Sequence, residues 1–147
     1  MSSKRQQIVD AIETRMKTIL TTGGYATNAG QRVYVWRTTP LADTELPALC
    51  LYDTTGEVNE DGGIIGKFSH RLDLSIEAIA SGSTTRSVVR NMIADVFKAL
   101  GTDEYFGGLV ETTSSPSHDI NLEQADKLIG AGIVKFSVTY RTNQWEI

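Results

Sequence analysis

The side chains best suited to act as a base or a nucleophile near neutral pH are His70, His118 and Cys50. His118 follows serines in the polar stretch 114–119, but neighbours in sequence do not make a nucleophile–base pair, and no Gly-x-Ser-x-Gly turn is present. His70 falls on the apolar face of an alternating segment, and Cys50 lies in an apolar run. These positions predict a packed histidine and a buried thiol, so we expect no catalytic residue and no enzyme activity.

Glycine pairs could in principle cradle a phosphate. Gly130-x-Gly132 lacks the third glycine of a dinucleotide fingerprint, and it precedes a predicted strand where the fingerprint follows one. Gly62-Gly63-x-x-Gly66 also precedes a predicted strand, and neither segment continues as a Walker loop. Both are predicted to be turns, and no nucleotide cofactor is expected.

Carboxylates gather in two places, near residues 57–61 and near residues 119–126. Oxygen ligands suit calcium, but neither group has the spacing of an EF-hand, and one cysteine with two histidines cannot build a cysteine- or histidine-rich zinc site. We interpret both groups as solvated acidic segments, and no metal ion is expected.

The composition places the chain among globular proteins. It has 147 residues, 40% hydrophobic and 22% charged, with a formal net charge of −4, which predicts a single domain over residues 1–147. The basic residues are scattered, which argues against a nucleic-acid binder, and no window approaches the about 18 consecutive apolar residues of a membrane span. The single cysteine excludes an internal disulfide, and the first residues do not read as a signal peptide, so we expect folding in a reducing cytoplasm.

Two segments have apolar residues at helical spacing. The first runs from about residue 3 to residue 20, with Ser2 or Ser3 as its cap and Gly23-Gly24 as its end. The second runs from about residue 85 to residue 100, with Thr84 as its cap and Gly101 after its last turn. Each stripe is expected to pack on a sheet.

The clearest strand covers residues 68–80, where apolar and polar side chains alternate for longer than in a usual strand. Residues 55–63 are acidic and rich in glycine, which predicts the tip of a long hairpin, and residues 114–118 are predicted to be a loop. Residues 120–128 fit either a strand or a short helix. Further strands are predicted over residues 32–37, 48–54, 109–113 and 134–140. The fold class that follows is α+β: a mixed, mainly antiparallel sheet with two amphipathic helices packed on one face and a long hairpin arm.

The order of the segments resembles that of bacteriophage tail terminator proteins, also called tail completion or minor tail protein U-like proteins. The resemblance covers residues 8–140 and lies in the order of its pieces, none of which is diagnostic alone. The pieces are Arg32-Val33-Tyr34, Arg37-x-x-Pro40-Leu41, Glu45-Leu46-Pro47-Ala48-Leu49-Cys50-Leu51-Tyr52, Leu72-x-Leu74-x-Ile76-Glu77-Ala78, the helix Val88–Leu100 and Phe136-x-Val138-x-Tyr140.

This resemblance implies a structural virion protein rather than an enzyme. Members form a ring, typically a homo-hexamer, at the head-proximal end of the tail tube, where they end tube polymerisation and offer a surface for head joining. The implied partners are further copies of the chain, the tail tube protein and the head–tail connector protein, while DNA passes through the lumen without specific binding and no membrane is involved. The implied location is the virion tail or neck, after assembly in the host cytoplasm.

Two alternatives stay open: a phage neck or head–tail connector protein, and a small bacterial α+β enzyme or ligand-binding domain. A cyclic ring needs two different patches that meet on neighbouring subunits, and a hairpin arm or an exposed edge strand fits that need. We predict that the interface contains residues of the arm and the C-terminal tail, namely Glu57, Glu60, Asp61, Ile64, Ile65, Phe68 and Trp145. Trp145 is expected either to contact a partner or to fold back on its own domain.

Overall fold

The first helix is shorter than its sequence pattern predicts. The computed structural model describes residues 2–37, 43–60, 65–82, 85–124 and 128–147. Helix α1 spans Lys4–Met16, and the Ser3 hydroxyl accepts a hydrogen bond from the Gln6 backbone N–H at 3.1 Å, which confirms the predicted cap. The helix ends at Met16, well before Gly23, and Gly30 lies against the carbonyls of the turn that follows: a Cβ at Gly30 would come within 2.7 Å of the Met16 oxygen.

The second helix agrees with its prediction. Helix α2 spans Thr85–Leu100 and buries the stripe that its spacing indicates, and the Gly101 N–H donates to the Phe97 carbonyl as the helix ends. The predicted cap, Thr84, lies outside the described residues. Four short 3₁₀ turns complete the helical content, at Thr21–Gly23, Ala29–Gln31, Asp43–Glu45 and Phe106–Gly108.

A six-stranded mixed sheet forms the body of the molecule. Its strands are β1 (Val33–Val35), β2 (Ala48–Glu60), β3 (Lys67–Ser81), β4 (Thr112–Thr113), β5 (Ser117–Gln124) and β6 (Leu128–Asn143). The order is β1-β2-β3-β6-β4, with β5 also paired to β6, and only the β1–β2 pair is parallel. The predicted α+β fold class is therefore confirmed.

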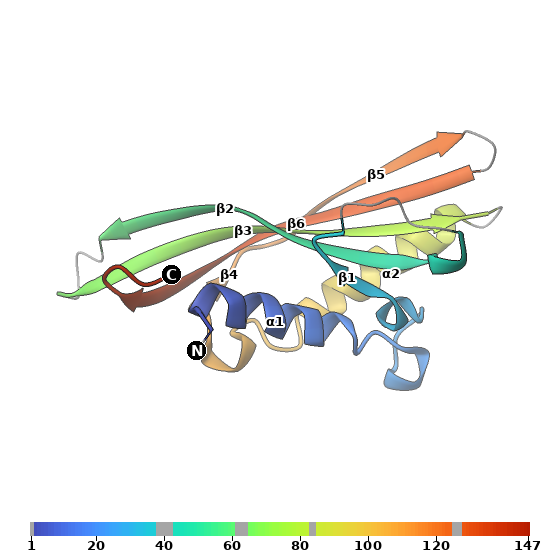
Figure 1. Ribbon diagram of the computed structural model, residues 1–147. Coiled ribbons are helices and arrows are strands. Elements are labelled where there is room, and N and C mark those ends of the chain that lie inside the picture. The colour runs from blue at the N-terminus through green and yellow to red at the C-terminus, as the bar shows by residue number, and fades with distance from the viewer. Residues whose placement is uncertain (1, 38–42, 61–64, 83–84, 125–127) are drawn as a thin grey trace.

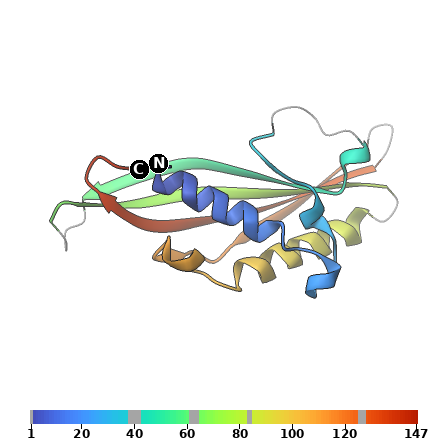
Figure 2. The same cartoon turned by 60° about the horizontal axis from the view of Figure 1, so that its bottom comes forward.

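Both helices cover the same face of the sheet and lie side by side on it (Figure 2). The core between the layers contains Ile8, Ile12 and Met16 from α1 together with Val89 and Met92 from α2, all buried. On β3 the predicted alternation is confirmed, because every second residue from His70 to Ala80 is buried on the helix-covered face. The side chains between them are mostly half-buried on the opposite face, which the helices leave open.

The hairpin prediction for residues 55–63 is partly wrong. Residues 55–60 belong to β2, which pairs with β3 as far as Glu60 opposite Phe68 after a register shift between Asp53 and Gly56. The acidic stretch is a strand because the ladder gives its backbone partners and sets Glu57 opposite Arg71. Residues 61–64, the centre of the predicted tip, lie outside the described residues.

Three other predictions need correction. Gly130 and Gly132 lie inside β6 rather than in a turn, and the end of the predicted loop 114–118 belongs to β5. This strand position carries a glycine because α2 approaches closely there: a Cβ at Gly132 would collide with the side chain of Ile93. The strand predicted over residues 109–113 shrinks to Thr112–Thr113.

Candidate interaction surface

From the first turn of α1 outward, the sheet extends as an arm, which we define as residues 56–60 of β2, 67–72 of β3 and 138–143 of β6. The three segments pair with one another in register, and they form the left end of the sheet in Figure 1. The chain termini meet near the arm, where the Lys4 N–H donates to the Ile147 carbonyl at 2.9 Å. The C-terminal residues, rather than a helix, therefore lie over the end of the arm on its helix-covered face.

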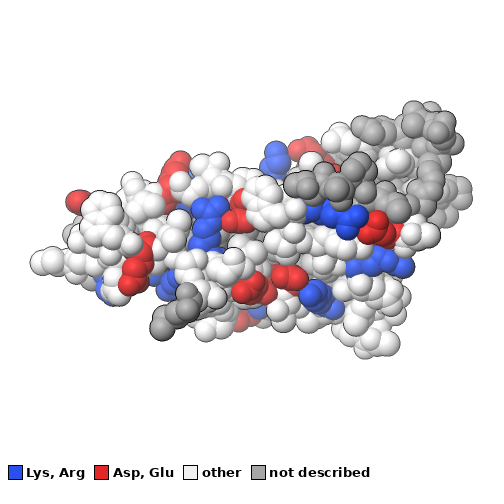
Figure 3. Space-filling model, in the orientation of Figure 1, with Lys and Arg blue, Asp and Glu red and all other residues white. Residues whose placement is uncertain are grey.

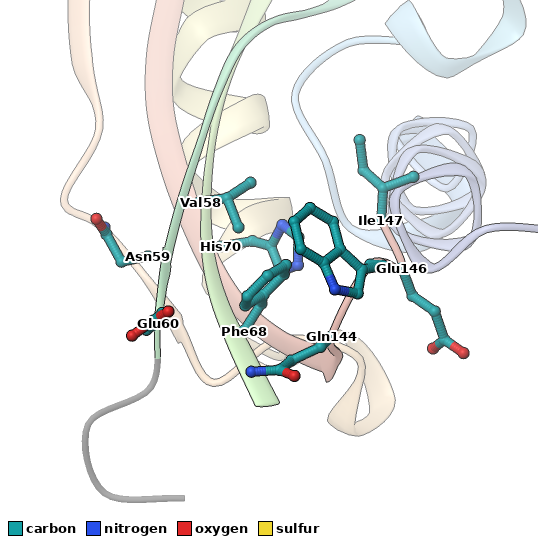
Figure 4. Close-up of a pocket in the computed structure, with 9 residues that line it drawn as sticks. Val58, Asn59, Glu60, Phe68, His70, Gln144, Glu146 and Ile147 are labelled. Atoms are coloured by element: carbon teal, nitrogen blue, oxygen red, sulfur yellow. The ribbon is translucent and has the colours of Figure 1, made fainter. Parts of the chain in front are cut away.

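A groove of about 690 Å³ runs between the arm and the C-terminal residues. The side chains of Val58, Phe68 and His70 come from one face of the β2–β3 ladder, and Ile147 lies across from them, while Asn59 points away (Figure 4). The remaining lining residues are Glu60, Gln144, Trp145 and Glu146. The groove thus has apolar walls and a polar rim.

His70 forms the floor of the groove and is almost completely buried. Its ring stacks on Tyr140 with centroids 4.6 Å apart, and its Nε2 lies 2.7 Å from the Thr142 hydroxyl oxygen. That hydroxyl donates toward the carbonyls of Asn143 and Glu146, which assigns the donor role in the histidine contact to Nε2–H. Burial lowers the pKa of His70, and the Lys4 ammonium lowers it further. The imidazole is a packed structural group, as its place on the alternating strand predicts.

Trp145 lies at the mouth of the groove. Its ring meets Phe68 edge-on with centroids 5.3 Å apart, yet 89% of the residue is exposed to solvent. The tail is held in place because the Gln144 N–H donates to the Gly66 carbonyl at 3.1 Å. Trp145 therefore folds back onto its own arm and still presents most of its indole outward.

The structure brings some of the predicted interface residues together and separates others. Glu60, Phe68 and Trp145 line the same groove, although they are distant in sequence. Glu57 lies opposite Arg71 on the other face of the ladder, and Ile65 is fully exposed in the turn before β3. Asp61 and Ile64 lie outside the described residues.

The prediction missed six of the residues that line the groove, among them Val58, His70 and Ile147. A signal for two of them was present. Phe68 and His70 share a face by the period of two, and a hairpin centred near residue 64 would set Val58 opposite His70, as the ladder does. Nothing in the sequence marks Ile147.

The remaining candidates for chemistry lie apart from one another. His118 lies on β5, edge-on to Phe97 with ring centroids 5.6 Å apart. Cys50 is buried in β2. Burial raises the pKa of its thiol, and the nearby Glu77 carboxylate raises it further.

In the described part of the chain, no three side chains of the His, Cys, Asp or Glu type gather as a metal site would require. The helices of the described residues are all too short or too polar to cross a membrane.

On the surface seen in Figure 3, basic and acidic side chains are mixed along the length of the molecule, and neither sign dominates one end. Several of them are paired, for example Arg5 with Asp53 at 2.8 Å and Arg141 with Glu111 at 3.2 Å. The groove on the arm is therefore distinguished by exposed apolar area rather than by charge.

Comparison with protein-family models and with curated proteins adds no relative. No protein-family model matches the chain, and no curated protein matches it in sequence. The groove, the sheet and the resemblance in segment order remain as the guides to function.

Proposed function

We propose that the chain is a structural phage protein that forms a ring at the head-proximal end of a tail tube, ends tube polymerisation and provides the surface for head joining. The observation that carries the proposal is the apolar groove on the arm. Val58 and Ile147 are each 50% exposed there, and Trp145 is more exposed still. Large apolar side chains grouped on an arm are typical of a surface that a partner covers.

A ring accounts for the arm. Cyclic assembly joins one patch of a subunit to a different patch of its neighbour, and an arm that reaches beyond the helices can supply one of these patches. In this proposal the ring is a homo-oligomer, a hexamer by resemblance. The tail tube protein and the head–tail connector protein bind its two sides, and DNA passes through the lumen without specific contacts.

The proposed place of action is the virion tail or neck, after assembly in the host cytoplasm. Capping also requires discrimination: one side of the ring must match the tube end, and the other must reject further tube subunits. No catalytic step is part of this function, so it is tested by assembly rather than by turnover.

Electron microscopy of phage that lack this gene tests the proposal. We expect tails of uncontrolled length or tails that fail to join heads, with normal particles restored by the wild-type gene supplied in trans. Tails of normal length attached to filled heads in the deletion would overturn the proposal. Scattering-based mass measurement on the purified protein is the companion test, because a chain that stays monomeric at every concentration would remove the ring.

A further inference from the structure

In the described part of the chain, the sheet leaves two longer strand segments unpaired on one side, one at each of its ends. On the arm, residues 56–60 of β2 lie beyond β1, which pairs only with Leu49–Leu51. At the other end, β5 pairs with β6 on one side, and among the described residues no strand pairs with its other side. The two segments lie at opposite ends of the sheet, β2 at the left and β5 at the right of Figure 1. Free edges present unpaired backbone N–H and C=O groups that favour pairing with another chain.

We propose, building on the ring of the proposed function, that β5 of one copy pairs antiparallel with residues 56–60 of β2 of the next copy. Strand direction alternates from β2 through β3 and β6 to β5, because each of these pairs is antiparallel. A following copy in the same orientation therefore sets its β2 antiparallel to β5, and the alternation continues through the contact. One heterologous contact of this kind pairs both of these segments, whereas a two-fold pairing of one segment with itself leaves the other unpaired.

The faces of the two edges also match. Val58 lies opposite His70, on the helix-covered face, and Ile120 lies opposite Gly132, on the same face. Both are exposed apolar side chains, at 50% and 45%. In a sheet that continues without a flip, Ile120 of one copy can lie directly beside Val58 of the next, at the edge of the groove.

Charge selects this register among its neighbours. With Ile120 opposite Val58, Asn59 faces Asp119 and Glu60 faces His118, so no like charges are directly opposite. A shift of two residues one way sets Glu57 opposite Asp119, and the same shift the other way sets Glu57 opposite Glu123. Shifts by one residue turn the apolar faces apart, and like charges opposite each other are unfavourable.

Disulfide trapping between two different single variants tests the pairing. Directly opposite residues have Cα atoms about 4.5–5.5 Å apart, within disulfide range, while diagonal ones are about 7–8 Å apart. We expect a mixture of Asn59→Cys and Asp119→Cys chains to form a covalent heterodimer. Wild-type protein, whose Cys50 is buried, serves as the background.

Matched controls fix the register and the symmetry. A mixture of Asn59→Cys and Asn121→Cys chains, which corresponds to the register shifted by two, is expected to cross-link more slowly. Equal or faster linking by this control pair would overturn the register. Self-linking of Asn59→Cys chains alone would show two β2 edges meeting around a two-fold axis, and would overturn the heterologous contact.

A chain carrying both Asn59→Cys and Asp119→Cys is expected to give a ladder of covalent oligomers that stops at the ring size. A charge test supports it: Asn59→Asp sets a carboxylate opposite Asp119 and is expected to weaken association about 1.4- to 5-fold per contact. Adding Asp119→Asn is expected to restore association. Association unchanged by Asn59→Asp would contradict the register.

The outcomes separate this inference from the function on which it rests. An oligomer of constant size with no cross-link in the mixture would overturn the edge pairing and leave the ring in place. Cross-links in purified protein, together with normal tails in the gene deletion, would overturn the tail function and leave the pairing in place. A monomer that never cross-links would overturn both.

Discussion

The two ends of the β3–β6 ladder are built from the same pair of strands but are covered in different ways. Near Ala78 and Gly132, α2 packs so closely that a side chain at Gly132 would collide with Ile93. Near His70 and Tyr140, only the first turn of α1 reaches the ladder, where Lys4 Nζ donates to the Arg141 carbonyl at 2.9 Å. The two rings stack on each other there, and the C-terminal residues lie beside them. The first end is a packed core, and the second is a surface that keeps apolar groups in contact with solvent.

This difference indicates where stability and association reside. Burial under a helix removes apolar area from water within one chain, and each fully buried large side chain contributes about 1.5–3 kcal/mol. The same kind of side chain left exposed on the arm contributes little to folding and remains available to a partner. Substitutions at the two ends should therefore separate loss of stability from loss of assembly.

The largest effect is expected at the helix-covered end. Ile93→Ala removes a buried side chain between α2 and β6, and should lower the free energy of unfolding by about 2–5 kcal/mol. Urea unfolding followed by circular dichroism measures it. A loss under about 0.5 kcal/mol would mean that α2 is not docked on the sheet as described.

Gly132→Ala is the matched change on the opposing surface. The added methyl group meets Ile93 and Val89, so overpacking should lower the free energy of unfolding by about 1–3 kcal/mol. In the Ile93→Ala background, Gly132→Ala should lower the free energy of unfolding by less than it does alone, because the shortened side chain at position 93 leaves space for the added methyl group. Additive losses in this double-mutant cycle would contradict the close approach of α2 to β6.

Much of the covered end could be predicted from sequence. The alternation along β3 and the apolar stripe of α2 are strong signals, because one face of each element is buried and the other is wet. The cap at Ser3 followed from the same reasoning. These features depend on local pattern, and local pattern is what a sequence shows directly.

The open end and the edges were harder to predict. Residues 55–60 and 117–121 are exposed edge strands, so they carry glycine, serine and charges where buried strands carry apolar residues. Such composition is typical of turns, and only long-range pairing makes these segments strands. The groove depends on the same pairing, so Phe68 and Trp145, which line it, were named from the sequence, but Val58 and Ile147 were missed.

An intermediate effect is expected at His70, and it depends on pH. Because burial lowers its pKa in the folded protein from the ordinary value of 6.5, the unfolded chain binds a proton first as pH falls. The histidine therefore supports folding above about pH 6.5 and loses that contribution as pH falls toward the lowered pKa.

His70→Gln provides the comparison, since glutamine cannot take up that proton. The free energy of unfolding of wild type should fall more steeply than that of His70→Gln between about pH 7.5 and about pH 5. Urea unfolding across this range measures the difference. Parallel curves would mean that the imidazole protonates as readily in the folded protein as in the unfolded chain, and that the arm is more hydrated than its stacking on Tyr140 implies.

The smallest effect on folding is expected at Trp145, although it is the largest side chain of the groove. Because 89% of the residue is exposed and only its edge-on contact with Phe68 is lost, Trp145→Ala should change the free energy of unfolding by no more than about 0.5 kcal/mol. Assembly should respond differently: in the proposed pairing, Ile120 of the next copy lies beside Val58, at the edge of the groove that Trp145 borders. The variant is therefore expected to shift the mass of the assembly toward monomer while its unfolding curve stays close to that of wild type.

Light scattering and urea unfolding on the same sample check both expectations, with Tyr105→Ala as a control because Tyr105 is exposed but lies outside the groove. A stability loss above about 1 kcal/mol would place Trp145 in the packed structure of its own chain, and the contrast between the covered end and the open end would then be weaker than the exposed indole indicates.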